Sequence, residues 1–118
     1  MKDVFSGVKA AYKALDDKLA MDITVLEIAP ISVIADYFVI ASASNSNQLK
    51  AMADNVEEQL YKAGFPLNHS EGIQFNSNWI LLDFGDIVVH LFNKDDREFY
   101  SIERIWGDAK VINEEDLK

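Results

Sequence analysis

The side chains most suited to chemistry gather in one short segment, Asp-Phe-Gly-Asp at residues 83–86. Asp83 and Asp86 form a carboxylate pair that could hold Mg²⁺, because this ion prefers oxygen ligands. A simpler interpretation is a turn, in which Gly85 adopts a positive φ and an aspartate bonds the turn backbone. Under that interpretation both carboxylates face water, and we favour it over the metal site.

The other candidate residues lack the partners that catalysis requires. His69-Ser70-Glu71 has the H-x-E pattern of zinc deaminases, but the chain has no cysteine to complete the zinc site. His90 has no second histidine at ligand spacing and is interpreted as a hydrogen-bonded or partly buried strand residue. The sequence also lacks a Walker loop, a dinucleotide-binding motif and a nucleophile elbow. These observations favour binding over catalysis, and we expect neither enzymatic activity nor a cofactor.

Aromatic residues beside charges indicate an interaction surface. Trp79 opens an apolar run, Phe84 lies at the turn, and Tyr100 lies in a predicted helix. An aromatic side chain at an exposed turn is unfavourable unless it packs or binds, and aromatic anchors beside charges are typical of protein interfaces. The alternative is that Trp79 and Tyr100 fill the edge of the core.

These residues depend on a hairpin that the rest of the chain must cover. Residues 79–92 predict two nearly fully buried strands joined by the turn. Apolar residues at helical spacing predict helices over 3–19 and 47–63, the second ending before Gly64. Runs rich in β-forming residues predict three further strands, at 23–28, 34–42 and 67–70. Asn93 can cap a last helix. We therefore expect an α/β (α+β-like) fold with a mixed sheet of about five strands flanked by helices.

Length and charge narrow the functional class. The 118 residues suit one domain, predicted at 1–106, with a mostly exposed tail at 107–118 that lacks periodicity. No apolar run approaches the ~20 residues of a membrane span, and the charged N-terminus is no secretory signal, so we expect a cytoplasmic protein. The net charge of −9 argues against direct nucleic-acid binding and suits a basic protein partner, although solubility alone would also explain it.

Several blocks, in their order and spacing, resemble the ribosomal silencing factor family, also called the iojap family. The resemblance runs from about residue 4 to Trp106 and is carried by these blocks: ADYFVIAS at 35–42 with Asn45, Ser46 and Gln48; Glu71-Gly72; residues 79–92; REFY at 97–100; and ERIW at 103–106.

The resemblance implies a translation repressor without enzymatic activity. Family members bind ribosomal protein fourteen of the large subunit, block joining of the small subunit, and often form homodimers when free. Their fold is similar to a nucleotidyltransferase domain without the catalytic acids. Phe84 departs from the Tyr or Leu that the family often carries there, and another hydrophobe should preserve the contact. The partner-binding residues that the resemblance implies are Trp79, Asp83, Phe84, Asp86, Arg97 and Tyr100.

Two other functions stay open at this stage. A small metal-dependent nucleotidyltransferase would use Asp83, Asp86 and Asp36 with Mg²⁺. The Gly-Ser pair and closely spaced acids that such an active site needs are absent from the sequence. A dimeric scaffold would use the same surface for a non-ribosomal partner.

Overall fold

A mixed sheet of six strands organises the part of the chain that the computed structural model describes, residues 3–30, 33–72, 79–94 and 109–117. The strand order is β3-β4-β5-β2-β1-β6. Strands β2 and β5 are parallel, and the other neighbours are antiparallel. The elements along the chain are α1 (Val4–Asp17), β1 (Met21–Glu27), β2 (Tyr37–Ala43), α2 (Ser46–Lys62), β3 (His69–Glu71), β4 (Trp79–Asp83), β5 (Ile87–Asn93), β6 (Lys110–Val111) and α5 (Glu114–Leu117).

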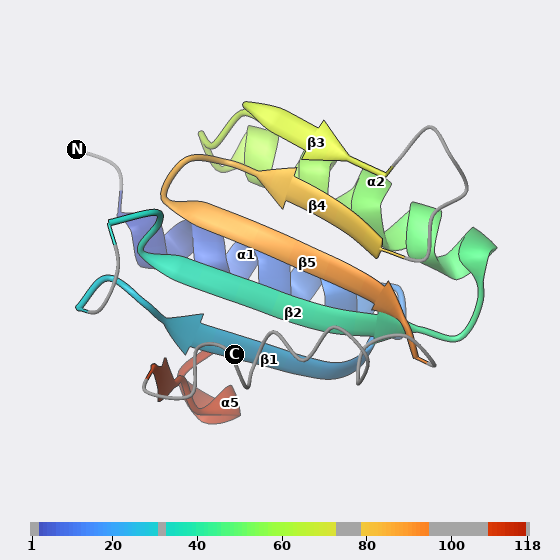
Figure 1. Ribbon diagram of the computed structural model, residues 1–118, viewed down its shortest axis with the longest axis horizontal. Helices are drawn as coiled ribbons and strands as arrows, with labels where there is room; N and C mark the ends of the chain where they lie inside the picture. Colours follow the sequence, from blue (N-terminus) through green and yellow to red (C-terminus); the bar gives the residue numbers. More distant parts are fainter. Residues whose placement is uncertain (1–2, 31–32, 73–78, 95–108, 118) are drawn as a thin grey trace.

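The two long helices form where their apolar stripes predict them and cover one face of the sheet, lying behind it in Figure 1. Each begins at a side-chain cap: Asp3 accepts a hydrogen bond from the Phe5 amide, and Asn45 accepts one from the Gln48 amide. The predicted mixed sheet with covering helices is thus confirmed.

Among the described residues, no helix is long and apolar enough to cross a membrane.

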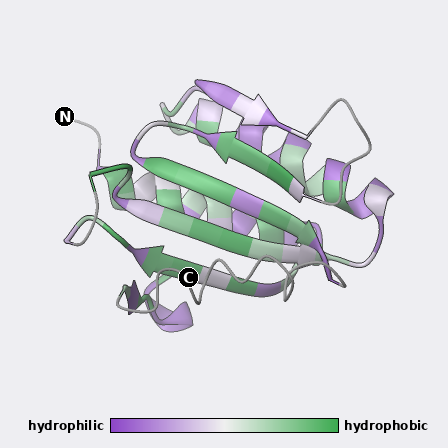
Figure 2. Ribbon diagram, viewed as in Figure 1, coloured by the Kyte–Doolittle hydropathy of each residue, from purple (hydrophilic) through white to green (hydrophobic). Residues whose placement is uncertain are grey.

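Alternation along the strands divides the core into two layers. The larger layer lies between the sheet and the helices and includes Val39, Val89 and Leu91. Residues of the opposite face, such as Phe38 and Phe92, form a second buried cluster. Figure 2 shows hydrophobic colours along β1, β2, β4 and β5, because their side chains are apolar on both faces.

The predicted hairpin is confirmed as β4 and β5, with Trp79 opposite Phe92 and Asp83 opposite Val88. Gly85 has a φ of 90°, and its amide donates to the Asp83 carboxylate at 2.8 Å. The turn therefore uses the predicted chemistry, a glycine at positive φ beside an aspartate that bonds the turn backbone.

The sequence missed two features. Strand β2 begins at Tyr37 rather than residue 34, so Ile34 belongs to an exposed loop. Residues 110–111 add a sixth strand, where about five were predicted, and Leu117 of α5 is buried against the larger core layer. Elements this short show no periodicity that the sequence could reveal. Most of the described residues between 109 and 117 are exposed. Asn93, the predicted cap of a last helix, is the last residue of β5, and the residues from Phe99 to Trp106 that the helix was predicted to carry lie outside the described residues.

One glutamine joins the ends of three elements. The Gln48 side chain donates from Nε2 to the carbonyl oxygens of Lys18 and Leu19, both at 3.0 Å. Its Oε1 accepts from the Ser44 amide at 2.6 Å. These bonds hold Leu19 at a φ of 60°, a backbone conformation unfavourable for a leucine.

We expect Gln48→Ala to lower the free energy of unfolding by about 1–2 kcal/mol, because three partly exposed hydrogen bonds are lost. Urea denaturation measures the change. The matched control is Asn47→Ala on the exposed face of the same helix turn, which should stay within about 0.5 kcal/mol. An effect of Gln48→Ala no larger than the control would show that the bonds do not stabilise the fold.

Candidate protein-binding surface

The residues predicted to bind a partner do not lie together in the structure. Trp79 is the first residue of β4 and Asp83 the last, so about 13 Å of strand separates them. Phe84 and Asp86 lie in the turn beyond Asp83. The predicted Arg97 and Tyr100 lie outside the described residues. The described candidates therefore divide between the Trp79 end and the turn end of the hairpin.

Trp79 lies over a group of rings on the face opposite the helices, which we call the aromatic face and define by Phe38, Trp79, His90 and Phe92. The Trp79 ring stacks on Phe92 with centroids 5.7 Å apart and lies 6.1 Å from His90. The Phe38 ring meets His90 edge-on at 4.8 Å. Trp79 is half-buried while the other three are buried, so part of this residue remains accessible although its ring packs against the core.

A glycine lets the chain beyond β3 pass close to the backbone of Trp79 on β4. Gly72 follows β3 with a φ of 88°, and a Cβ there would collide with the Trp79 carbonyl oxygen. The close approach of the two backbones therefore requires glycine. This gives a structural reason for the Glu71-Gly72 pair, which the sequence indicated only as a turn.

His90 is buried to 5% exposure at the centre of the aromatic face. Neither ring nitrogen has a hydrogen-bond partner among the described residues. Burial lowers the pKa of His90 from 6.5 to about 4, because the charged imidazolium is poorly solvated there. The sequence allowed a hydrogen-bonded or partly buried histidine; the structure shows deeper burial and no hydrogen bond among those residues.

The two aspartates of the turn have different roles. Asp83 is half-buried, lies on the same face as Trp79 by strand alternation, and uses its carboxylate in the turn. Asp86 is exposed, and its carbonyl accepts from the amides of Asp36 at 2.8 Å and Tyr37 at 3.1 Å. Among the described residues, no three His, Asp or Glu side chains gather in a way that could hold a metal ion.

Phe84 is not the exposed turn residue that the sequence suggested. It is 5% exposed and belongs to the core layer beneath the helices. The reason is alternation: Ile80 and Leu82 point to the helix side, and Phe84 continues that series into the turn. Phe84 also lines a hollow of about 340 Å³, together with Val4, Gly64, Phe65, Pro66, Asn68 and Asp86.

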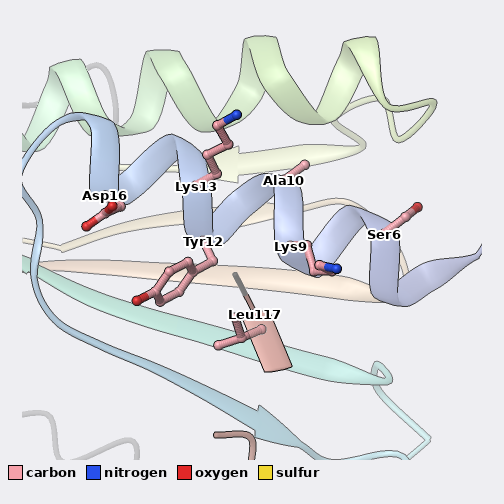
Figure 3. Close-up of a pocket in the computed structure, with 7 residues that line it drawn as sticks. All are labelled: Ser6, Lys9, Ala10, Tyr12, Lys13, Asp16 and Leu117. Carbon is pink, nitrogen blue, oxygen red and sulfur yellow. The ribbon is translucent and has the colours of Figure 1, made fainter. Parts of the chain in front are cut away.

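A larger hollow of about 450 Å³ lies between α1 and α5 (Figure 3). Tyr12 and Leu117 meet in it, and the Tyr12 hydroxyl donates to the Glu114 carboxylate at 2.8 Å. Burial, followed by this carboxylate, raises the pKa of Tyr12 to about 12. Lys9 and Lys13 line the hollow alongside Asp16. This mixture of charges favours no single class of ligand. The contacts of Tyr12 with Glu114 and Leu117 show mainly how α5 is held against α1.

Comparison with known proteins shows which family this chain resembles. Residues 2–118 match the family model described as "Ribosomal silencing factor during starvation". The chain is 41% identical to the ribosomal silencing factor of Bacillus subtilis over 108 residues, covering 92% of this chain and 91% of that protein. It is also 35% identical to the chloroplastic Iojap protein of Arabidopsis thaliana over 100 residues, covering 85% of this chain and 41% of that protein.

Solved structures of similar proteins share the fold. A crystal structure of a Chromobacterium violaceum protein superposes with a TM-score of 0.85 at 32% identity, covering 89% of this chain and 87% of that one. A crystal structure from Bacillus halodurans gives 0.77 at 31% identity, covering 90% and 95%. Since sequence and fold agree over nearly the whole chain, this protein belongs to the ribosomal silencing factor family.

Proposed function

We propose that this protein represses translation by binding ribosomal protein fourteen of the large ribosomal subunit and blocking attachment of the small subunit. Family membership supports the coarser part of the proposal, a role in regulating translation. The proposal places the protein in the cytoplasm, and we expect a homodimer as its free form. It assigns no catalytic step to the chain.

The observation that carries the finer part is the half-buried Trp79 stacked against the buried rings of the aromatic face. An aromatic anchor that is already packed on one side loses little conformational freedom when it binds. Asp83 lies on the same face of β4, about 13 Å along the strand, and offers a separate acidic contact at the turn end. An aromatic anchor and an acidic contact on the same face of one strand fit a basic ribosomal protein.

Charge sets how the complex forms. The chain carries a net charge of −9 and is repelled by ribosomal RNA, so attraction must come from local contacts between its acids and the partner's basic residues. Rim charges of this kind act mainly on the association rate, while the buried aromatic contact slows dissociation.

Co-sedimentation with purified large and small subunits tests the proposal. We expect the protein to pellet with large subunits and not with small ones. In light-scattering measurements of subunit joining, it should inhibit when added before the small subunit and have little effect afterwards. Equal binding to both subunits, or equal inhibition in either order, would contradict a simple steric block.

We expect Trp79→Ala to weaken binding to large subunits by about thirtyfold or more, the usual effect of removing an aromatic anchor. The matched control is Tyr61→Ala, which removes an aromatic side chain that is 71% exposed on α2. Thermal denaturation of both variants verifies that they are folded. If both bind like the wild type, Trp79 is not part of the contact.

A further inference from the structure

The loop between β1 and β2 exposes two adjacent apolar side chains. Val33 is fully exposed, and Ile34 is 64% exposed. Single exposed apolar residues are ordinary on protein surfaces, whereas a contiguous exposed apolar patch rimmed by polar residues marks an interaction site.

Backbone hydrogen bonds fix the base of this loop. The amides of Ile28 and Ala29 both donate to the Asp36 carbonyl, at 2.9 and 3.2 Å. The amide of Asp36 donates in turn to the Asp86 carbonyl, and Ala35 is buried. The loop is therefore attached to the hairpin turn, and both lie at the end of the sheet where α1 begins (Figure 1). The fold itself presents Val33 and Ile34 to solvent.

The surroundings of the loop are acidic. Asp3 and Asp86 are exposed, and Asp36 is half-buried. Asp36 and Asp86 are joined by the backbone bond just described, and Asp36 and Asp3 both lie near Tyr37. The pKa of Tyr37 is raised by burial first and then by the carboxylates of Glu27, Asp36 and Asp3. Lys110 lies opposite Glu27 in the β1–β6 register, but no ion pair joins the two.

We propose that Val33 and Ile34 anchor a second docking surface, which receives a basic protein segment that offers an apolar pocket. The carboxylates of Asp3, Asp36 and Asp86 form its rim. A second copy of this chain fits poorly, because a two-fold interface sets each surface against itself and would place acid against acid. Nucleic acid is repelled by the same carboxylates.

The identity of the basic segment rests on the proposed function, since we assign it to a protein of the large ribosomal subunit. This surface lies at the turn end of the hairpin, away from Trp79 at the other end of β4. Two separated contacts on one particle strengthen binding together, because the second forms within the complex made by the first.

The test combines Val33→Ser with Ile34→Ser and measures binding to purified large subunits. We expect affinity to fall at least about tenfold, while the melting temperature stays unchanged because both side chains are exposed. The matched control is Leu19→Asn, which removes an apolar side chain that is 80% exposed at the opposite end of the sheet. Asparagine tolerates the positive φ at that position, so the control should fold and bind normally.

A charge variant tests the rim. Asp3→Asn with Asp36→Asn keeps the helix cap, since asparagine caps as well as aspartate does. We expect slower association and a weaker dependence on salt concentration.

Each failure has a distinct pattern. If the wild type does not bind large subunits, the proposed function fails and this inference fails with it. If the wild type binds and the serine variant binds equally well, only the second surface is refuted. If the serine variant loses binding to protein-free ribosomal RNA to the same extent as binding to large subunits, the occupant of the surface is nucleic acid. If the serine variant changes the oligomeric state of the protein, the occupant is a second copy of this chain. Either result would overturn the proposal of a basic protein.

Discussion

Phe84→Ala is expected to lower the free energy of unfolding by about 3–5 kcal/mol, although the residue lies in a hairpin turn. Its side chain is 5% exposed and packs in the layer between the sheet and the helices. Truncation would remove apolar contacts and leave a cavity beside Val4 and Phe65, which line the same hollow. Since most domains are stable by only about 5–15 kcal/mol, this is a large loss.

Urea denaturation at 25 °C measures this effect. The turn itself should persist, because the Phe84 amide donates to the Ile87 carbonyl whatever the side chain. Phe84→Leu, which keeps most of the apolar volume, should cost about 1 kcal/mol. The matched control in the same turn is Asp86→Ala, an exposed position, with an expected change within about 0.5 kcal/mol. If Phe84→Ala were no more destabilised than this control, Phe84 would not be a core residue.

The stability of the protein is expected to fall by about 3 kcal/mol between pH 6.5 and pH 4 because of His90 alone. The pKa of His90 is lowered from 6.5 to about 4 by burial. The unfolded chain therefore takes up a proton below pH 6.5, whereas the folded protein does so only below about pH 4. Each unit of difference is worth about 1.4 kcal/mol, so the contribution is complete above pH 6.5 and is lost as the pH falls.

Comparison with His90→Phe isolates this contribution from the carboxylates, which titrate in both proteins. Phenylalanine keeps a ring beside Trp79 and Phe92 but cannot bind a proton. The stability of the variant relative to the wild type should therefore increase by about 3 kcal/mol from pH 7.5 to pH 4. The matched control is His69→Gln, which replaces the other histidine of the sequence at a position that is 60% exposed. Parallel profiles for wild type and His90→Phe would show that His90 ionises freely in the folded state.

The helices and the hairpin could be predicted because their signals are local. The stripe through Val8 and Leu15 marks α1, and the Asp83-Gly85 turn follows from two residues with special backbone preferences. The family could also be recognised, because its blocks are contiguous in the sequence. Periodicity alone does not say which face of the sheet the helices cover, and that decides which side chains remain available to a partner.

The candidate surface was only partly predictable. The alternative that Trp79 fills the edge of the core is confirmed in part, since its ring packs on Phe92 and is half-buried. Its role as an anchor stays a prediction. Phe84 was misjudged, because a turn residue was assumed to face water. Val33 was not considered, because two apolar residues before a strand resemble the start of that strand. Whether these two residues pair within the sheet or face solvent depends on the hydrogen bond from the Asp36 amide to the carbonyl of Asp86, fifty residues further along the chain.

The sequence by itself determined the family, the two long helices, the mixed sheet and the acidic character of the chain, because each depends on composition or on neighbours along the chain. Only the tertiary structure decided that Phe84 is buried, that His90 is buried beside Trp79 without a hydrogen bond among the described residues, and that Val33 faces solvent. Exposure depends on which distant segments pack over a side chain. A local pattern can show that a residue is apolar, but only the packed fold determines whether it joins the core or remains open to a partner.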